Sequence, residues 1–467
     1  MSHPRLVTTL MAALGASLCS CVSMAPEQQT PPLPVPDTWP PSAPVGSAVQ
    51  PAHALQWRDY FTDPLLQQLI QTALDNNRDL RLAALRVEEA RAAFRIQRAD
   101  QFPTLTLGAQ AARARVPGDL NASGQSAIGS EYRVELGVSS WELDLWGRVR
   151  SLKESALQQW LASEAGRRSV EQVLIAQVAD GYVGLRELDE RLVRARRSEE
   201  TRAEGYRIFT RRFEVGSASR LELAGVKTLL TQAQSLRLQL EQTRALQLHA
   251  LAQLIGANPG PLPPLVPFNQ AALLADVSPG LPSDLLVERP DVIAAEHRLR
   301  SANADIGAAR AAFLPRIALT GTWGTASSEL QGLFDSGSQA WTSAPVISLP
   351  IFDGGRLSAN LELTRVRRDI ALTDYEKTIQ TAFREVADAL AARRWLGEQL
   401  EVQRAGLDAQ TERARLAQLR YAAGSAAYLE VLDAQRDLLD AEQAVVQVQR
   451  ALLSSQIALY AALGGGA

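Results

Sequence analysis

An internal repeat is the feature that most constrains the fold, because the second half of the chain follows the pattern of the first. ADQFPTLTL at 99–107 is matched by AAFLPRIAL at 311–319, 212 positions later. Further along the offset is 208 positions, where Gly147-Arg148 matches Gly355-Arg356. Because there are only two copies, the pattern predicts a duplicated fold rather than a solenoid.

The ends of the two repeats match as well. Asn77-Arg78-Asp79-Leu80 matches Arg289-Pro290-Asp291-Val292 at the offset of 212, and Leu254-Ile255-Gly256 matches Ala462-Leu463-Gly464 at the offset of 208. The change of offset predicts an exposed loop between the proline and the Gly-Arg pair, because length differences concentrate in loops. The predicted parts are a first repeat at 56–256, a Pro-rich linker at 257–281 and a second repeat at 282–467.

Each repeat contains a segment that alternates apolar and polar residues. TLTLGAQA at 104–111 and EYRVELGV at 131–138 alternate in the first repeat, and 316–323 and 341–351 correspond to them in the second. We predict two strands within about 103–145 and two within about 315–352. Strands of about ten residues with one apolar face are typical of outer-membrane barrels. A soluble hairpin with one wet face fits the alternation equally well.

Long helices are predicted after each Gly-Arg pair, at about 148–256 and 356–463, with a break at Gly216 and at Gly424. Apolar residues recur every seven positions in the last of them, which indicates a coiled-coil seam. This column consists of Val431, Leu438, Val445, Leu452 and Leu459. A soluble helical bundle explains the heptads but not the paired strands.

The N-terminus has the pattern of a lipoprotein signal. An apolar run from Leu6 to Leu18 is too short to span a bilayer and is typical of a signal peptide, predicted at 1–20. Leu18-Cys19-Ser20-Cys21 resembles the bacterial lipobox, so we predict a lipid on Cys21, followed by a tether at 21–55. A plain secretory signal is the alternative. Since no later apolar run has about 18 residues, any membrane crossing must use strands.

Nothing in the sequence predicts catalysis. The net charge is −3, which gives no reason to expect a nucleic-acid partner. The four histidines are scattered, and no motif for a metal, a bound phosphate or an activated nucleophile is present. We therefore predict no enzyme activity and no catalytic, cofactor-binding or metal-binding residues. The only expected attached group is the lipid on Cys21.

The predicted strands require association with further copies of the chain. Two repeats with two strands each supply four strands, whereas the smallest outer-membrane barrels have eight. The chain must therefore oligomerise to close a barrel. Three copies would supply twelve strands, although strand counting alone does not select three.

Several segments resemble the TolC-type outer-membrane factors, and in particular the NodT-like lipoprotein branch of multidrug efflux channels. They are WELDLWGR (141–148), LPSDLLVERPDVIAAEHRL (281–299), ANADIGAARAAFLPRIALTGTWG (302–324) and LPIFDGGR (349–356). The resemblance extends from about residue 55 to 463. It implies a mixed α and β membrane protein, in which a homotrimer forms a twelve-stranded outer-membrane β-barrel, four strands per chain. A long α-helical coiled-coil barrel would continue it into the periplasm.

The resemblance also implies roles for individual residues. The tips of the helical hairpins would contact a periplasmic membrane-fusion adaptor through Val215, Gly216, Ser217, Ala423, Gly424 and Ser425. In the closed channel Leu429 would form an apolar ring and Asp433 an acidic ring, with Arg436 nearby. Tyr421 and Glu222 match positions that hydrogen-bond between neighbouring hairpins. A solvated helix face, or plain coiled-coil packing, is the alternative for each residue.

The implied function is a passive exit duct of a tripartite efflux pump, carrying drugs or other small molecules out of the cell. Its partners would be the adaptor, an inner-membrane transporter of the resistance-nodulation-division type and outer-membrane lipid. Metal-ion efflux or type I protein secretion through a duct of the same family is one alternative. A lipid-anchored periplasmic scaffold without a pore is another, but it leaves the alternating hairpins unexplained.

Overall fold

The structure is a computed structural model that describes residues 24–27, 34–36, 39, 55–260 and 284–465. Cys21, the signal peptide and most of the predicted tether and linker lie outside these residues. The chain divides into two compact units. The sheet unit comprises residues 1–32, 86–163 and 295–375, and the helical unit comprises 33–85, 164–294 and 376–467.

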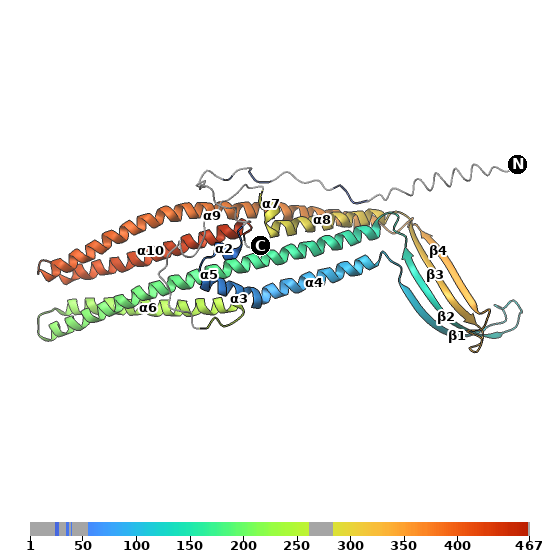
Figure 1. Cartoon of the computed structure of the whole chain (residues 1–467), viewed down its shortest axis with the longest axis horizontal. Coiled ribbons are helices and arrows are strands. Elements are labelled where there is room, and N and C mark those ends of the chain that lie inside the picture. The colour runs from blue at the N-terminus through green and yellow to red at the C-terminus, as the bar shows by residue number, and fades with distance from the viewer. Residues whose placement is uncertain (1–23, 28–33, 37–38, 40–54, 261–283, 466–467) are drawn as a thin grey trace. The chain divides into compact units, whose positions relative to one another are not determined.

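The sheet unit contains one antiparallel sheet with the strand order β1-β2-β3-β4. The strands are β1 (Leu105–Val116), β2 (Ala127–Glu142), β3 (Arg316–Ser327) and β4 (Gln339–Ser348) (Figure 1). The pairing of β2 with β3 joins a strand from each predicted repeat. The last strand ends at Ser348, earlier than the predicted 351. The edges of the sheet are β1 and β4.

The two faces of the sheet differ in chemistry. Leu107 pairs with Leu136, Leu136 with Trp323 and Trp323 with Trp341, so one face carries a row of large apolar side chains. On the opposite face Glu135 lies between Gly108 and Gly324. A β-carbon on Gly324 would lie 2.1 Å from the carbonyl oxygen of Val134, so only glycine fits this approach of β2 to β3.

Two helices of equal length precede the two pairs of strands. They are α4 (Arg78–Ala99), before β1, and α8 (Pro290–Ala311), before β3. The first described residues of the chain lie against α8. Asn303 donates a hydrogen bond to the carbonyl of Pro26 at 3.3 Å, and Arg310 donates to the carbonyl of Met24 at 3.2 Å. Gly307 permits this contact, because a β-carbon there would lie 2.8 Å from the backbone nitrogen of Ala25.

The helical unit contains two hairpins, α5 with α6 and α9 with α10 (Figure 1). Their bounds are α5 (Arg148–Glu214), α6 (Arg220–Ile255), α9 (Arg356–Ala422) and α10 (Tyr428–Ala462). Both α5 and α9 have 67 residues, and their bounds are 208 positions apart, as the sequence offset predicts. None of the helices in the described ranges carries an apolar stretch long enough to cross a bilayer.

Three short helices complete the helical unit: α2 (Trp57–Tyr60), α3 (Pro64–Asn76) and α7 (Leu285–Glu288). Asp63 caps α3 by accepting hydrogen bonds from the backbone of Leu65 and Leu66. The hydroxyl of the buried Tyr182 donates to the same carboxylate at 2.7 Å. Tyr60 and Tyr460 stack with ring centroids 3.9 Å apart, so aromatic side chains fix α2 on α10 and α3 on α5.

Candidate functional site at the helical hairpin tips

The two hairpin tips have the same backbone geometry. Gly216 and Gly424 adopt φ angles of +74° and +73°, the left-handed conformation that favours glycine. The backbone N–H of Ser217 donates to the carbonyl of Arg212, and that of Ser425 donates to the carbonyl of Arg420, at 2.7 and 2.9 Å. This is the Schellman arrangement, which satisfies the last carbonyls of α5 and α9. Val215 and the predicted tip glycines lie in these turns, with Val215 78% exposed.

The helices that leave the two tips begin differently. In α6 the Ser219 hydroxyl accepts from the backbone of Glu222, and the Glu222 carboxylate accepts from the backbone of Ser219, forming a capping box. These hydrogen bonds lower the pKa of Glu222, with the backbone N–H of Ser219 as the largest cause. At the equivalent start of α10 the cap is Ala427, which offers no side-chain hydrogen bond. The second tip therefore lacks one constraint that the first has.

An ion pair replaces the capping box at the second tip. Glu430, the counterpart of Glu222 at the offset of 208, accepts from Arg420 at 2.5 Å. The two side chains are 40% and 56% exposed, so solvent screens the pair and it contributes little to stability. The first turn of α10 is consequently held more weakly than that of α6.

Aromatic rings join the two hairpins near the tips. The Tyr428 ring on α10 lies 4.4 Å from that of Phe209 on α5 and 4.9 Å from that of Tyr421 on α9, measured between centroids. Burial raises the pKa of the Tyr428 phenol. Arg212 of the first hairpin donates to the Tyr421 hydroxyl of the second and lies over the Phe209 ring. This cluster is the main polar and aromatic link between the tips of one chain.

Three of the predicted gate residues, Leu429, Asp433 and Arg436, lie near the start of α10. Leu429 is 64% exposed and its counterpart at the first tip, Leu221, is 83% exposed, so each tip leaves an apolar side chain available for a partner. Asp433 and Arg436 form an ion pair at 3.6 Å. Arg436 also contacts Asp437 at 3.1 Å, and Asp437 contacts Arg413 on α9 at 2.6 Å. The acidic positions are therefore part of a charged chain that crosses the second hairpin.

The structure brings together some of the predicted residues and separates others. Tyr421 accepts a hydrogen bond from Arg212 of the other hairpin of the same chain. The Glu222 carboxylate accepts from Ser219 of its own hairpin. The predicted roles of Tyr421 and Glu222 in holding the tips of the closed channel together stay predictions. Ser219 itself was identifiable from the sequence, since a serine followed three positions later by glutamate marks a helix start. Arg212 carries no such local signal.

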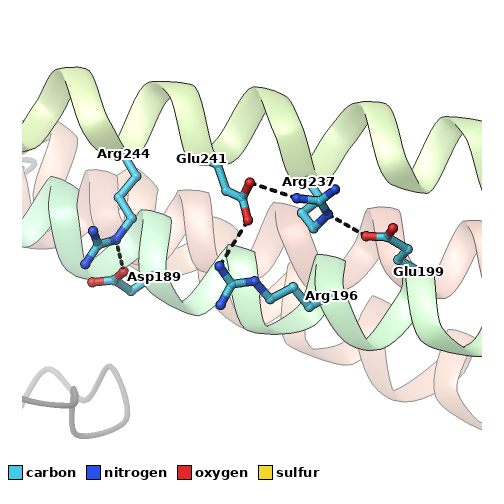
Figure 2. A network of polar contacts seen from close by, with 6 residues as sticks. All are labelled: Asp189, Arg196, Glu199, Arg237, Glu241 and Arg244. Carbon is cyan, nitrogen blue, oxygen red and sulfur yellow. Dashed lines mark hydrogen bonds and ion pairs between the residues drawn. The ribbon is translucent and has the colours of Figure 1, made fainter.

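The middle of the first hairpin is held by charges. Arg237 on α6 contacts Glu199 on α5 at 2.6 Å and Glu241 at 2.8 Å, and Glu241 contacts Arg196 on α5 at 3.0 Å (Figure 2). Arg244 pairs with Asp189 in the same network. These residues come from both helices, so the network fastens α5 to α6.

The equivalent region of the second hairpin is apolar. Val445 and Leu452 stand 208 positions after Arg237 and Arg244, and Leu407 stands 208 after Glu199. With Leu400 they form a cluster in which Leu400, Val445 and Leu452 are buried. The two hairpins thus differ at these matching positions, where Arg237 and Arg244 are charged and Val445 and Leu452 are apolar. They share an apolar cluster nearby, because Leu192 of the first hairpin is buried as its counterpart Leu400 is. Within the described residues no three His, Cys, Asp or Glu side chains gather as metal ligands.

Comparisons with known proteins agree with this architecture. The model of the outer membrane efflux protein family matches residues 69–257 and again residues 281–465. The outer membrane protein OprJ of Pseudomonas aeruginosa is 42% identical over 470 residues, covering 98% of this chain and 95% of that protein. The probable efflux pump outer membrane protein TtgC of Pseudomonas putida is 44% identical over 462 residues, with the same coverage.

Solved structures show the same fold. The open state of the Neisseria gonorrhoeae MtrE outer membrane channel superposes with a TM-score of 0.87 at 39% identity, covering 95% of this chain and 98% of that one. A membrane protein from Pseudomonas aeruginosa gives 0.88 at 42% identity, covering 95% and 100%. The mixed α and β fold and the resemblance noted in the sequence are thereby confirmed, and the chain belongs to the outer membrane efflux protein family.

Proposed function

We propose that the protein is the outer-membrane exit duct of a tripartite efflux pump and that it conducts drugs or other small molecules passively. The observation that carries this proposal is a four-stranded sheet with one apolar face and two unpaired edges. Long unpaired edges are unstable in water and in lipid, where every backbone group needs a partner. The sheet unit is therefore a segment of a closed barrel.

Strand direction allows identical copies to close this barrel. All three pairings in the sheet are antiparallel, so β1 and β4 run in opposite directions. The β4 edge of one copy can then pair with the β1 edge of the next without breaking the alternation. Three copies would supply twelve strands, within the range of outer-membrane barrels. The resemblance to the TolC-type outer-membrane factors implies three copies, a number that strand counting alone does not select.

The hairpin tips supply the gate in this proposal. Leu429 would form an apolar ring and Asp433 an acidic ring around the threefold axis, and such rings control conduction by dewetting and by charge. The second hairpin is suited to move, because α10 lacks the capping box of α6 and its tip is held by exposed ion pairs. The Arg212–Tyr421 hydrogen bond links this hairpin to the first and would hold it in the closed position.

The partners follow from the same surfaces. The exposed tip turns at Val215-Gly216-Ser217 and Ala423-Gly424-Ser425 would contact the periplasmic adaptor, which connects the duct to an inner-membrane transporter of the resistance-nodulation-division type. A lipid on Cys21 would anchor the chain. The docking of Met24 and Pro26 on α8 of the sheet unit supports this, because it fixes the chain three residues after the acylated position.

Single-channel conductance in planar bilayers tests the proposal. Purified wild-type protein should give long-lived openings of low conductance. The double variant Leu429→Ala, Asp433→Ala should clearly increase the conductance of these openings. Tyr421→Phe should raise the frequency of opening, because it removes the bond from Arg212. Tyr206→Phe on α5 is the matched control, since the Tyr206 ring packs in the apolar cluster without a described hydroxyl partner. A well-folded sample without conductance would instead support the lipid-anchored scaffold.

A further inference from the structure

Two arginines stand apart from the other charges of the strands. On β1 the apolar face of the sheet runs through Leu105, Leu107, Ala109 and Ala111. Side chains alternate along a strand, so Arg113 and Arg115 belong to the same face. The remaining charges within the paired rows of β2, Glu131, Arg133 and Glu135, all lie on the opposite face, as their pairing with Ala112, Gln110 and Gly108 shows. The apolar face therefore ends in a basic pair.

The position of this pair is defined by the strand register. Ala111 pairs with Tyr132, so a tyrosine lies in the last row of the apolar face. Arg113 occupies the next row, opposite Ser130, and Arg115 the row after it, opposite Ile128. Both rows lead to the loop that joins β1 to β2. Tyrosine is enriched where hydrocarbon meets headgroups, and arginine on a lipid-facing surface is tolerated near that level but costly at the bilayer centre.

Neither guanidinium is neutralised within the described part of the chain. No carboxylate there lies within ion-pair distance of Arg113 or Arg115, and Arg115 donates a hydrogen bond to the Ser126 hydroxyl at 3.3 Å. Arg133, on the opposite face, is by contrast paired with Glu131. Both arginines of the basic pair are exposed on an edge strand.

We propose that Arg113 and Arg115 bind the phosphate groups of lipid headgroups in the outer leaflet. The planar guanidinium binds phosphate through two parallel N–H donors. Two arginines on one face of a strand are about 7 Å apart along it, which suits neighbouring phosphates on a lipid surface. The site would fix the height of the sheet in the membrane, with the tyrosine row at the hydrocarbon boundary. This inference rests on the proposed barrel, because only a barrel turns this face to lipid.

Lipid retention measures the site directly. Full-length protein is purified in detergent and equilibrated with mixed micelles of phosphatidylcholine and phosphatidic acid, and the bound lipids are counted by native mass spectrometry. Removing a basic residue near an anionic lipid surface costs about fivefold in affinity. Arg113→Gln with Arg115→Gln should therefore weaken phosphatidic acid binding by about 25-fold. The double Arg→Lys variant should keep most of it.

Two controls separate the explanations. Arg133→Gln removes a charge from the opposite face and should leave phosphatidic acid binding unchanged. Inorganic phosphate should displace no more phosphatidic acid than sodium chloride of equal ionic strength, because lipid binding also uses the acyl chains. Equal retention by wild type and the double Gln variant would overturn the proposal, as would specific displacement by inorganic phosphate, which would indicate a site for free anions.

Conductance and lipid retention, measured on the same preparations, distinguish a failure of the lipid site from a failure of the duct. Normal single-channel conductance with unchanged lipid retention in the double Gln variant would refute the lipid site alone. Absence of conductance from the wild-type protein would refute the duct, and with it the outward direction of this face.

Discussion

Arg289 donates a hydrogen bond from its guanidinium to the carbonyl oxygen of Ala462, at the last residue of α10, over 2.9 Å. The side chain of Asn77 donates in the same way to the carbonyl of Leu254 at the end of α6, also over 2.9 Å. The two donors are 212 positions apart and the two acceptors 208, the same offsets that relate the repeats. Each repeat is thus closed by a side chain that binds its own last helix.

A glycine completes each of these contacts. A β-carbon on Gly256 would lie 2.5 Å from the carbonyl oxygen of Asn76, and one on Gly464 would lie 3.1 Å from that of Glu288. Both glycines have positive φ, +69° and +85°. Each donor also makes a second kind of interaction. Asn77 caps α4 by accepting a hydrogen bond from the backbone of Leu80, whereas Arg289 forms ion pairs with Asp291 and Glu385.

Replacing Arg289 should destabilise the helical unit strongly. Arg289 is only 7% exposed, and Arg289→Met would leave the Ala462 carbonyl and two carboxylates without this partner. Because both carboxylates are partly exposed, we expect a loss of about 2–3 kcal/mol, below the full cost of breaking a buried pair. Thermal unfolding followed by circular dichroism measures it. Arg298→Met, at an exposed position of α8, should change the midpoint little.

A hydroxyl at position 427 should stabilise the start of α10. Ala427→Ser would place a serine three residues before Glu430 and recreate the capping box of α6, worth about 1 kcal/mol. Hydrogen exchange of the amides at 428–431 should slow about fivefold. Ser219→Ala should accelerate exchange at the start of α6 by a similar factor. Unchanged exchange in Ala427→Ser would show that the Arg420–Glu430 pair already holds this turn.

The two hairpins should respond differently to salt. Arg244→Ala removes a partly exposed ion pair from the first hairpin and should cost about 1 kcal/mol at low salt and less at high salt. Leu452→Ala, at the matching position of the second hairpin, removes a buried apolar side chain and should cost about 2–5 kcal/mol at any salt concentration. Denaturant unfolding at two ionic strengths compares them. Equal salt dependence of the two variants would contradict a stabilising role of the Arg244–Asp189 ion pair in the first hairpin.

The start of α6 should loosen in acid. The pKa of Glu222 is lowered in the folded protein by hydrogen bonds from Ser219. A carboxyl with a lowered pKa contributes stability that is present above its unfolded pKa of about 4.3 and is lost as pH falls through the folded value. Hydrogen exchange at 220–223 should therefore be steady from neutral pH to about 4.3 and increase below it, after correction for the intrinsic rate. Ser219→Ala should remove this dependence, and an increase beginning at neutral pH would exclude Glu222 as its cause.

Local signals explain why much of the fold could be predicted. The alternation in TLTLGAQA and in EYRVELGV indicates a strand with one apolar face. The first segment lies almost wholly in β1 and the second lies in β2. The long helices were predicted to break at Gly216 and Gly424, and both glycines adopt the left-handed conformation in a turn. Residues 64–99 are nevertheless two helices, α3 and α4, separated at Asn77, because the Asn77 side chain caps the second of them. The roles of Cys21, Leu429, Asp433 and the tip residues stay predictions, as do the trimer and the outer-membrane barrel.

The sequence by itself determined the elements, their lengths and the duplication, because helix and strand periods, glycine turns and a repeated offset are all properties of neighbouring residues. Only the tertiary structure decided which side chains meet. Arg212 reaches Tyr421 across 209 positions and Asn77 reaches Leu254 across 177, and neither partner is marked by spacing. It also decided that Arg237 and Arg244 form ion pairs between α5 and α6, whereas Val445 and Leu452 at the matching positions pack in an apolar cluster. A heptad pattern identifies which positions face a neighbouring helix, but packing determines which neighbour each position meets and therefore which contact forms.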